Sequence, residues 1–182
     1  MLEISLHILD IVENSTRAGA STVSVDIIED TARDVLSLEI RDNGSGMTED
    51  VLNKVIDPFF TTKKVRSVGL GLPMLALAAE RAEGRFAIES KGGEGTRVTA
   101  DFKLTHIDRQ PLGDISGTLV ALIAGNEDVD FIYRHEHNGQ VYILDTREIK
   151  KEIEDIPINH VAVLNFIRNH ITEGLKEIGA EA

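Results

Sequence analysis

Residues 10–20 read DIVENSTRAGA, and this stretch decides the fold that we expect for the chain. It closes a longer segment, residues 2–18, in which Leu, Ile and Val recur at mostly helical spacing until a glycine stops the pattern. We therefore predict a helix over residues 2–18. Asp10, Asn14 and Arg17 are four and three residues apart, so they share one face of that helix.

This helix face offers a carboxylate, a neutral amide oxygen and a cation on successive turns. Magnesium keeps several waters and takes few protein ligands besides phosphate oxygens, so Asn14 facing a triphosphate would suffice as a protein ligand. Arg17 would then balance phosphate charge. A second interpretation stays open, because these residues also fit the solvent-facing side of an ordinary amphipathic helix, the commoner arrangement for such a face taken alone.

Strands and two further helices follow. Alternating apolar and polar residues predict four half-buried strands, at residues 23–27, 36–41, 86–88 and 97–104. A short helix is predicted over residues 48–55, and an apolar helix runs through residues 73–82, opened by a proline in its first turn. Four strands and three helices predict an α+β layer sandwich.

The loop after the second strand, residues 42–47, reads DNGSGM. Asp42 stands at the end of a buried strand, and Gly44 and Gly46 let the backbone approach a flat ligand closely. A carboxylate in this place can accept a hydrogen bond from an exocyclic amine such as that of adenine. The alternative is a solvent-facing aspartate in a turn.

Residues 57–72 read DPFFTTKKVRSVGLGL and combine aromatic, basic and glycine residues. Phe59 and Lys63 fit a lid with a packed hinge and a cationic tip. Gly69 and Gly71 lie just before a predicted helix N-terminus, where free N–H groups and the helix dipole favour anions. The spacing matches neither a dinucleotide-binding glycine fingerprint nor a Walker A loop.

A last element, GEGT at residues 93–96, places the Thr96 hydroxyl at a strand start, where it could bond a base or its own turn. In order and spacing, the elements resemble the N box, G1 box, F box, G2 box and closing Gly-x-Gly-Thr of the GHKL ATP-binding superfamily. That superfamily includes gyrase, a heat-shock chaperone, sensor histidine kinases and MutL. Each box is weak alone, but five in order are specific.

The resemblance covers about residues 5–104. It implies the Bergerat fold, a two-layer α/β sandwich whose mixed sheet is covered by helices, with ATP or ADP and Mg²⁺ as cofactors. It makes Asn14 the magnesium ligand and Asp42 the carboxylate that reads adenine. The implied nucleotide contacts are, in chain order, Asn14, Arg17, Asp42, Gly44, Gly46, Met47, Phe59, Lys63, Gly69, Leu70, Gly71, Leu72 and Thr96.

Asp10 is the expected catalytic residue, and it departs from the family pattern. Members that hydrolyse ATP or phosphorylate proteins on serine typically carry Glu there as a general base, but a shorter Asp can reach through a water. We expect no hairpin with a phosphoacceptor histidine before the first helix. The expected function is therefore a stand-alone kinase acting on a separate protein, or a slow ATPase. The alternative is a module that signals its ATP or ADP state to a partner without phosphotransfer.

Residues 105–182, which we call the tail, contain no motif that matches this superfamily. We expect an ATP-binding domain at residues 1–104, a linker at residues 105–117 and a small α+β C-terminal extension at residues 118–182, with a hairpin around Asn138-Gly139. A long helix near residues 158–178 has an apolar stripe that must pack on the hairpin, the first domain or a second copy of the chain. The tail is thus a candidate for homodimer or partner contact. His135 and His137 share a strand face and could bind metal, but with no third ligand evident an edge-strand role is favoured.

Charge and composition limit the partners. The chain has 182 residues, a net charge of −12 and no cysteine. An acidic chain without a basic run is poorly suited to nucleic acid or anionic membranes, and no apolar run is long enough to span a bilayer, so we expect a cytoplasmic protein. A phosphorylated ligand would need local cations, such as those near Lys63.

Overall fold

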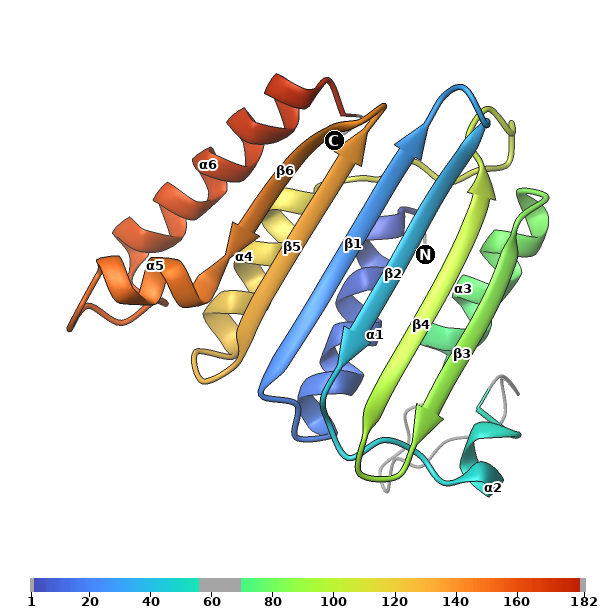
Figure 1. The fold of residues 1–182 in the computed structure, drawn as a ribbon, viewed down its shortest axis with the longest axis horizontal. Coiled ribbons are helices and arrows are strands. Elements are labelled where there is room, and N and C mark those ends of the chain that lie inside the picture. Colours follow the sequence, from blue (N-terminus) through green and yellow to red (C-terminus); the bar gives the residue numbers. More distant parts are fainter. Residues whose placement is uncertain (1, 56–69, 181–182) are drawn as a thin grey trace.

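The computed structural model describes residues 2–55 and 70–180, and it is built on one six-stranded sheet. The strands are β1 (Thr22–Asp30), β2 (Val35–Asp42), β3 (Arg85–Lys91), β4 (Gly95–Lys103), β5 (Asp130–His137) and β6 (Gln140–Asp145). They lie in the order β3-β4-β2-β1-β5-β6 (Figure 1). Strands β1 and β5 pair in parallel and the other neighbours pair antiparallel, so the sheet is mixed.

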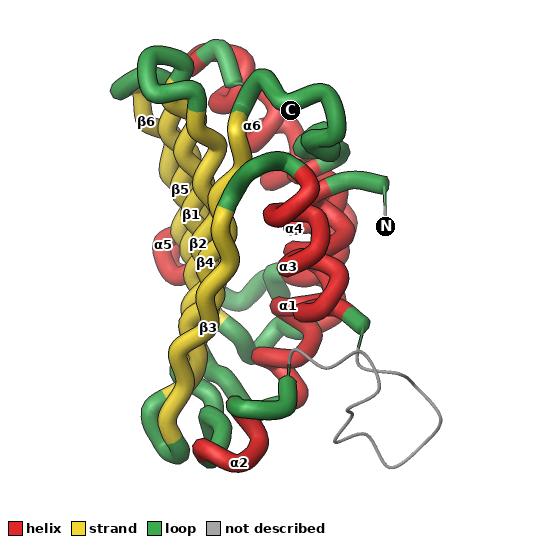
Figure 2. Tube along the Cα trace, turned by 90° about the vertical axis from the view of Figure 1, so that its right-hand side faces the viewer, coloured by secondary structure: helices red, strands yellow, loops and turns green. Residues whose placement is uncertain are grey.

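Helices cover one face of the sheet. They are α1 (Ile4–Arg17), α3 (Gly71–Arg81), α4 (Ile115–Gly125) and α6 (Val161–Ile178). Figure 2 shows these helices on one side of the strands and the short α5 (Thr146–Glu152) on the other, while α2 (Glu49–Leu52) lies near the end of β3. The predicted two-layer α+β sandwich is confirmed. Within residues 2–55 and 70–180, no helix has the length and apolar character to cross a membrane.

The alternation predicted from the sequence explains the packing of the first two strands. In β1, Val23, Val25 and Ile27 are buried while the residues between them are partly exposed. They pack under the apolar face of α1, where Ile8 and Val12 are fully buried. Removal of this apolar surface from water is the main force that holds the helix on the sheet.

The predicted linker is packed against α1. The carbonyls of Pro111 and Leu112 accept hydrogen bonds from the N–H groups of Ile4 and Ser5, each at 2.9 Å, and Leu112 is fully buried. Residues 105–117 therefore fix the N-terminal end of α1.

The tail extends the same sheet. Strand β5 pairs with β1 over eight residues, from Thr22↔Asp130 to Glu29↔His137, and α4 packs on α1. The predicted hairpin is confirmed, with its turn at Asn138-Gly139, and α6 packs on β6 and α4. The hydrophobic core thus runs without interruption through both parts of the chain.

The edge-strand interpretation of His135 is wrong, because β5 lies between β1 and β6 and His135 is fully buried. Its Nε2 lies 2.7 Å from Glu29 Oε1 and its Nδ1 lies 2.5 Å from the Tyr133 hydroxyl. Burial raises the pKa of Tyr133, so its hydroxyl keeps its proton and can donate to Nδ1 while Nε2–H donates to Glu29. In the part of the chain that the structure describes, no group of three His, Cys, Asp or Glu side chains could hold a metal ion.

We predict that Glu29→Ala lowers the free energy of unfolding by about 3 kcal/mol, because it leaves the buried His135 nitrogen without its acceptor and opens a cavity. The matched control is Glu39→Ala on β2, whose carboxylate pairs with Arg97 at the surface; its loss should cost at most about 1 kcal/mol. Chemical denaturation of both variants measures the difference. If both variants lose the same free energy of unfolding, the buried Glu29–His135 contact contributes no more to stability than the surface pair.

Candidate functional site

Asp42 is the centre of the candidate site, at the C-terminal end of β2. Its side chain is buried beneath the C-terminal half of α1. Oδ1 accepts a hydrogen bond from the Gly44 N–H at 2.9 Å, and Oδ2 accepts one from the Ser15 hydroxyl at 2.6 Å. Two donors thus fix the carboxylate plane, one from the loop and one from the helix. Our sequence analysis missed Ser15, whose only signal was its place beside Asn14 in the helix segment.

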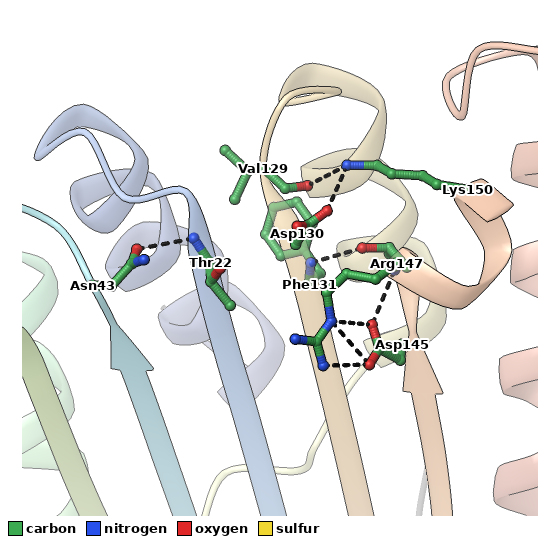
Figure 3. A network of polar contacts seen from close by, with 9 residues as sticks. Thr22, Asn43, Val129, Asp130, Phe131, Asp145, Arg147 and Lys150 are labelled. Atoms are coloured by element: carbon green, nitrogen blue, oxygen red, sulfur yellow. Dashed lines mark hydrogen bonds and ion pairs between the residues drawn. The ribbon is translucent and has the colours of Figure 1, made fainter. Parts of the chain in front are cut away.

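The loop after Asp42 is fixed at both ends. Asn43 Oδ1 accepts hydrogen bonds from the N–H groups of Ser21 and Thr22, each at 2.9 Å, and Figure 3 shows the bond from Thr22. The Ser45 N–H donates to the carbonyl of Ala18 at 2.8 Å. These bonds hold the loop against the α1–β1 turn. A Cβ at Gly44 would lie 3.0–3.1 Å from atoms of Ala18 and Asp42, so glycine lets the loop pack closely against the α1–β1 turn without this crowding.

Thr96 lies opposite Asp42 in the register of β2 and β4. Its hydroxyl is 2.9 Å from that of Ser90 on β3, and Ser90 also accepts the Met47 N–H at 2.9 Å. The structure therefore brings Asp42, Met47 and Thr96 to one end of the sheet. Ser90 was missed, because its position depends on the β3–β4 pairing.

The polar face of α1 continues from this end of the sheet. Asn14 is exposed and Asp10 is partly exposed, and within the described residues neither side chain has a hydrogen-bond partner. Arg17 is paired with Glu13 at 2.8 Å, with both side chains about half exposed. Such a surface pair contributes at most about 1 kcal/mol, so Arg17 can exchange Glu13 for a ligand phosphate.

The N-terminus of α3 meets this face. Gly71 is buried, and a Cβ added there would lie 3.2 Å from Asp10 Cβ and 3.5 Å from Asp10 Oδ2. Glycine thus lets the first turn of α3, with its free N–H groups, approach Asp10 closely. Leu70 is exposed and Leu72 is partly buried against the core. The predicted contacts Phe59, Lys63 and Gly69 lie outside the described residues.

The donor set fits a magnesium ion that is shared with phosphate. Asp10 and Asn14 are one helical turn apart and offer a carboxylate and an amide oxygen without other hydrogen-bond partners in the described ranges. Magnesium prefers oxygen ligands and needs only one or two from the protein when phosphates supply others. Asn14 would hold the ion, with the Asp10 carboxylate one helical turn away.

The family described as "Histidine kinase-, DNA gyrase B-, and HSP90-like ATPase" matches residues 3–106. This range contains every candidate site residue named above. A "Putative sensor protein" of Shewanella frigidimarina is 29% identical over 103 residues, which cover 56% of this chain and 16% of that protein.

Two further relatives are named as kinases. A "Probable C4-dicarboxylate sensor kinase" of Halalkalibacterium halodurans is 37% identical over 83 residues, which cover 46% of this chain and 15% of that protein. "Sporulation kinase E" of Bacillus subtilis is 41% identical over 64 residues, which cover 35% of this chain and 8% of that protein. The chain therefore matches between 8% and 16% of the length of these three relatives.

One solved structure resembles the whole chain. The N-terminal domain of a DNA repair protein has a TM-score of 0.55 at 14% sequence identity, over 99% of this chain and 57% of that chain. At this identity the likeness shows the fold alone. The likeness includes the strands and helices of the tail.

We predict that Gly46→Ala destabilises the fold by about 1–3 kcal/mol, because Gly46 has φ +64° and an added Cβ would lie 2.0 Å from the Lys91 carbonyl oxygen. Thermal unfolding measures the loss. Gly92→Ala in the neighbouring turn is the control, since its Cβ would meet open space, and it should stay within about 0.5 kcal/mol of the parent. If Gly46→Ala unfolds at the same temperature as the parent, the loop does not depend on this close backbone contact.

Proposed function

Because the chain belongs to the histidine kinase-, DNA gyrase B- and HSP90-like ATPase family, we propose that it binds Mg-ATP and acts as a stand-alone kinase on a separate protein, or as a slow ATPase. The observation that carries the proposal is the buried Asp42 carboxylate, held by Ser15 and Gly44 at the end of β2. This carboxylate lies on the face of the sheet that the helices cover, at the end from which the polar face of α1 continues. We assign this activity to the cytoplasm, where ATP is available.

Asp42 reads the base in this proposal. Each of its oxygens already accepts one hydrogen bond and has a further lone pair for a ligand N–H. An exocyclic amine offers the N–H donors that such a carboxylate can accept, and a hydrogen bond to an ionised acceptor is stronger than one between neutral groups. Gly44 has no side chain that could cover the carboxylate.

The phosphates lie toward α1 and α3. Asn14 would hold Mg²⁺, which when bound neutralises charge on phosphate oxygens. Arg17 leaves its surface pair with Glu13 and contacts a phosphate. The N–H groups of the first turn of α3 face the same region because Gly71 packs against Asp10.

Asp10 has the catalytic role. Its carboxylate is partly exposed and makes no hydrogen bond within the described residues, so it is available to accept a proton from a water or an acceptor hydroxyl. We place the phosphoacceptor in another protein; the names of two relatives, which are called kinases, support phosphotransfer as the activity. The alternative function, a nucleotide sensor without phosphotransfer, is favoured by the shorter reach of Asp compared with Glu.

We predict that Asp42→Ala weakens ATP binding about 10- to 150-fold, because a hydrogen bond to a charged group contributes about 1.5–3 kcal/mol. Isothermal titration calorimetry in the presence of magnesium measures the affinity. Asp101→Ala is a matched control, since Asp101 accepts a hydrogen bond from Ser37 at 2.7 Å on the same pair of strands, away from the site. Unchanged ATP affinity in Asp42→Ala would refute the base contact.

We predict that Asp10→Asn abolishes phosphate release or transfer from ATP but leaves ATP affinity within about twofold. The amide is close in size to the carboxylate and leaves Asn14 in place for the metal, but it cannot accept the proton. Glu13→Gln on the next turn is the control and should retain turnover. If Asp10→Asn turns over ATP as fast as the parent, Asp10 is not the base.

If the parent protein binds ATP and shows no turnover, the sensor alternative replaces the kinase or ATPase.

A further inference from the structure

Ser90 on β3 sits between three polar atoms at the floor of the proposed base site. Its hydroxyl oxygen is 2.9 Å from the Met47 nitrogen, 2.9 Å from the Gly95 carbonyl oxygen and 2.9 Å from the Thr96 hydroxyl oxygen. The direction of two of these hydrogen bonds is fixed, because the Met47 N–H can only donate and the Gly95 carbonyl can only accept. The third contact must therefore adapt to them.

A serine hydroxyl has one hydrogen and two lone pairs. The hydrogen is needed by the Gly95 carbonyl, and one lone pair is taken by the Met47 N–H. The remaining lone pair can bond Thr96 only if Thr96 is the donor. The arrangement that makes all three bonds thus points the Thr96 hydrogen at Ser90 and leaves the Thr96 lone pairs for a ligand.

The neighbouring Asp42 carboxylate also presents lone pairs to a ligand. Asp42 accepts from Ser15 and Gly44, and Thr96 lies directly opposite it in the β2–β4 register. Ser15 is buried, and its shortest contact is the 2.6 Å bond to Asp42, compared with 3.3 Å to the Ile11 carbonyl. Two side chains at this floor therefore offer lone pairs and no hydrogen to a base.

We propose that Ser90 is a positioning residue that holds Thr96 as an acceptor and so makes the site select 6-amino purines over 6-oxo purines. The inference rests on the proposed nucleotide function. Adenine carries two N–H donors at position 6, which suit Asp42 and Thr96. Hypoxanthine carries a carbonyl oxygen there, which would face the Thr96 lone pairs without a hydrogen between them.

The test compares ADP with IDP, which differ at that edge of the base, by calorimetry with magnesium. We expect the parent to prefer ADP and Ser90→Ala to narrow that preference on the order of tenfold, since a freed Thr96 hydroxyl can turn and donate to the IDP carbonyl. The control is Ser37→Ala, which removes a serine hydroxyl from the opposite face of the same sheet and should keep the parent ratio. Thermal unfolding checks that each variant is folded.

A folded Ser90→Ala variant with the parent ADP-to-IDP ratio would overturn the inference. If Ser90→Ala does not fold, Thr96→Val and Thr96→Ser decide. Thr96→Val should narrow the preference and Thr96→Ser should keep it, whereas an unchanged ratio in Thr96→Val overturns the inference. A parent protein that binds neither nucleotide refutes the proposed function itself, which is a different outcome from an unchanged ratio.

Discussion

The hydrogen bond between Ser15 and Asp42 is the interaction on which the candidate site depends. It crosses from α1 to the end of β2, at 2.6 Å, between two buried groups. A buried carboxylate needs donors to offset its lost hydration, and Ser15 and Gly44 supply them before any ligand arrives. The same helix packs against the N-terminus of α3, where Gly71 lies beside Asp10.

Residues close in sequence made much of this predictable. The helical spacing of Asp10 and Asn14 and the place of Asp42 at a strand end are local properties, and both are found in the structure. Ser90 and Gly95 could not be predicted, because their roles come from contacts across strands. Gly95 packs against the Asp42 carbonyl so closely that a Cβ added to Gly95 would lie 2.0 Å from the carbonyl oxygen. No periodicity in the sequence indicates such a contact.

The tail shows the same limit on a larger scale. Its hairpin was predicted from the Asn138-Gly139 turn, but the pairing of β5 with β1 joins segments more than a hundred residues apart. Glu29 and His135 form one buried polar pair across that junction. A single sequence shows two apolar strands and cannot show that they are neighbours, because the pairing is decided by the shared core beneath them.

The position of β5 connects the tail to the loop that carries Asp42. Asn43 binds the N–H of Ser21, and the carbonyl of Ser21 accepts a hydrogen bond from the Asp130 N–H at 2.9 Å. Asp130 in turn pairs with Lys150 of α5 at 2.8 Å (Figure 3). Because each of these bonds is made at the end of a strand, a shift of the loop must move Ser21 and β5 or break a bond. Three consecutive hydrogen bonds thus connect the sheet end that would bind the base to the start of the tail, in addition to the β1–β5 pairing and the shared core.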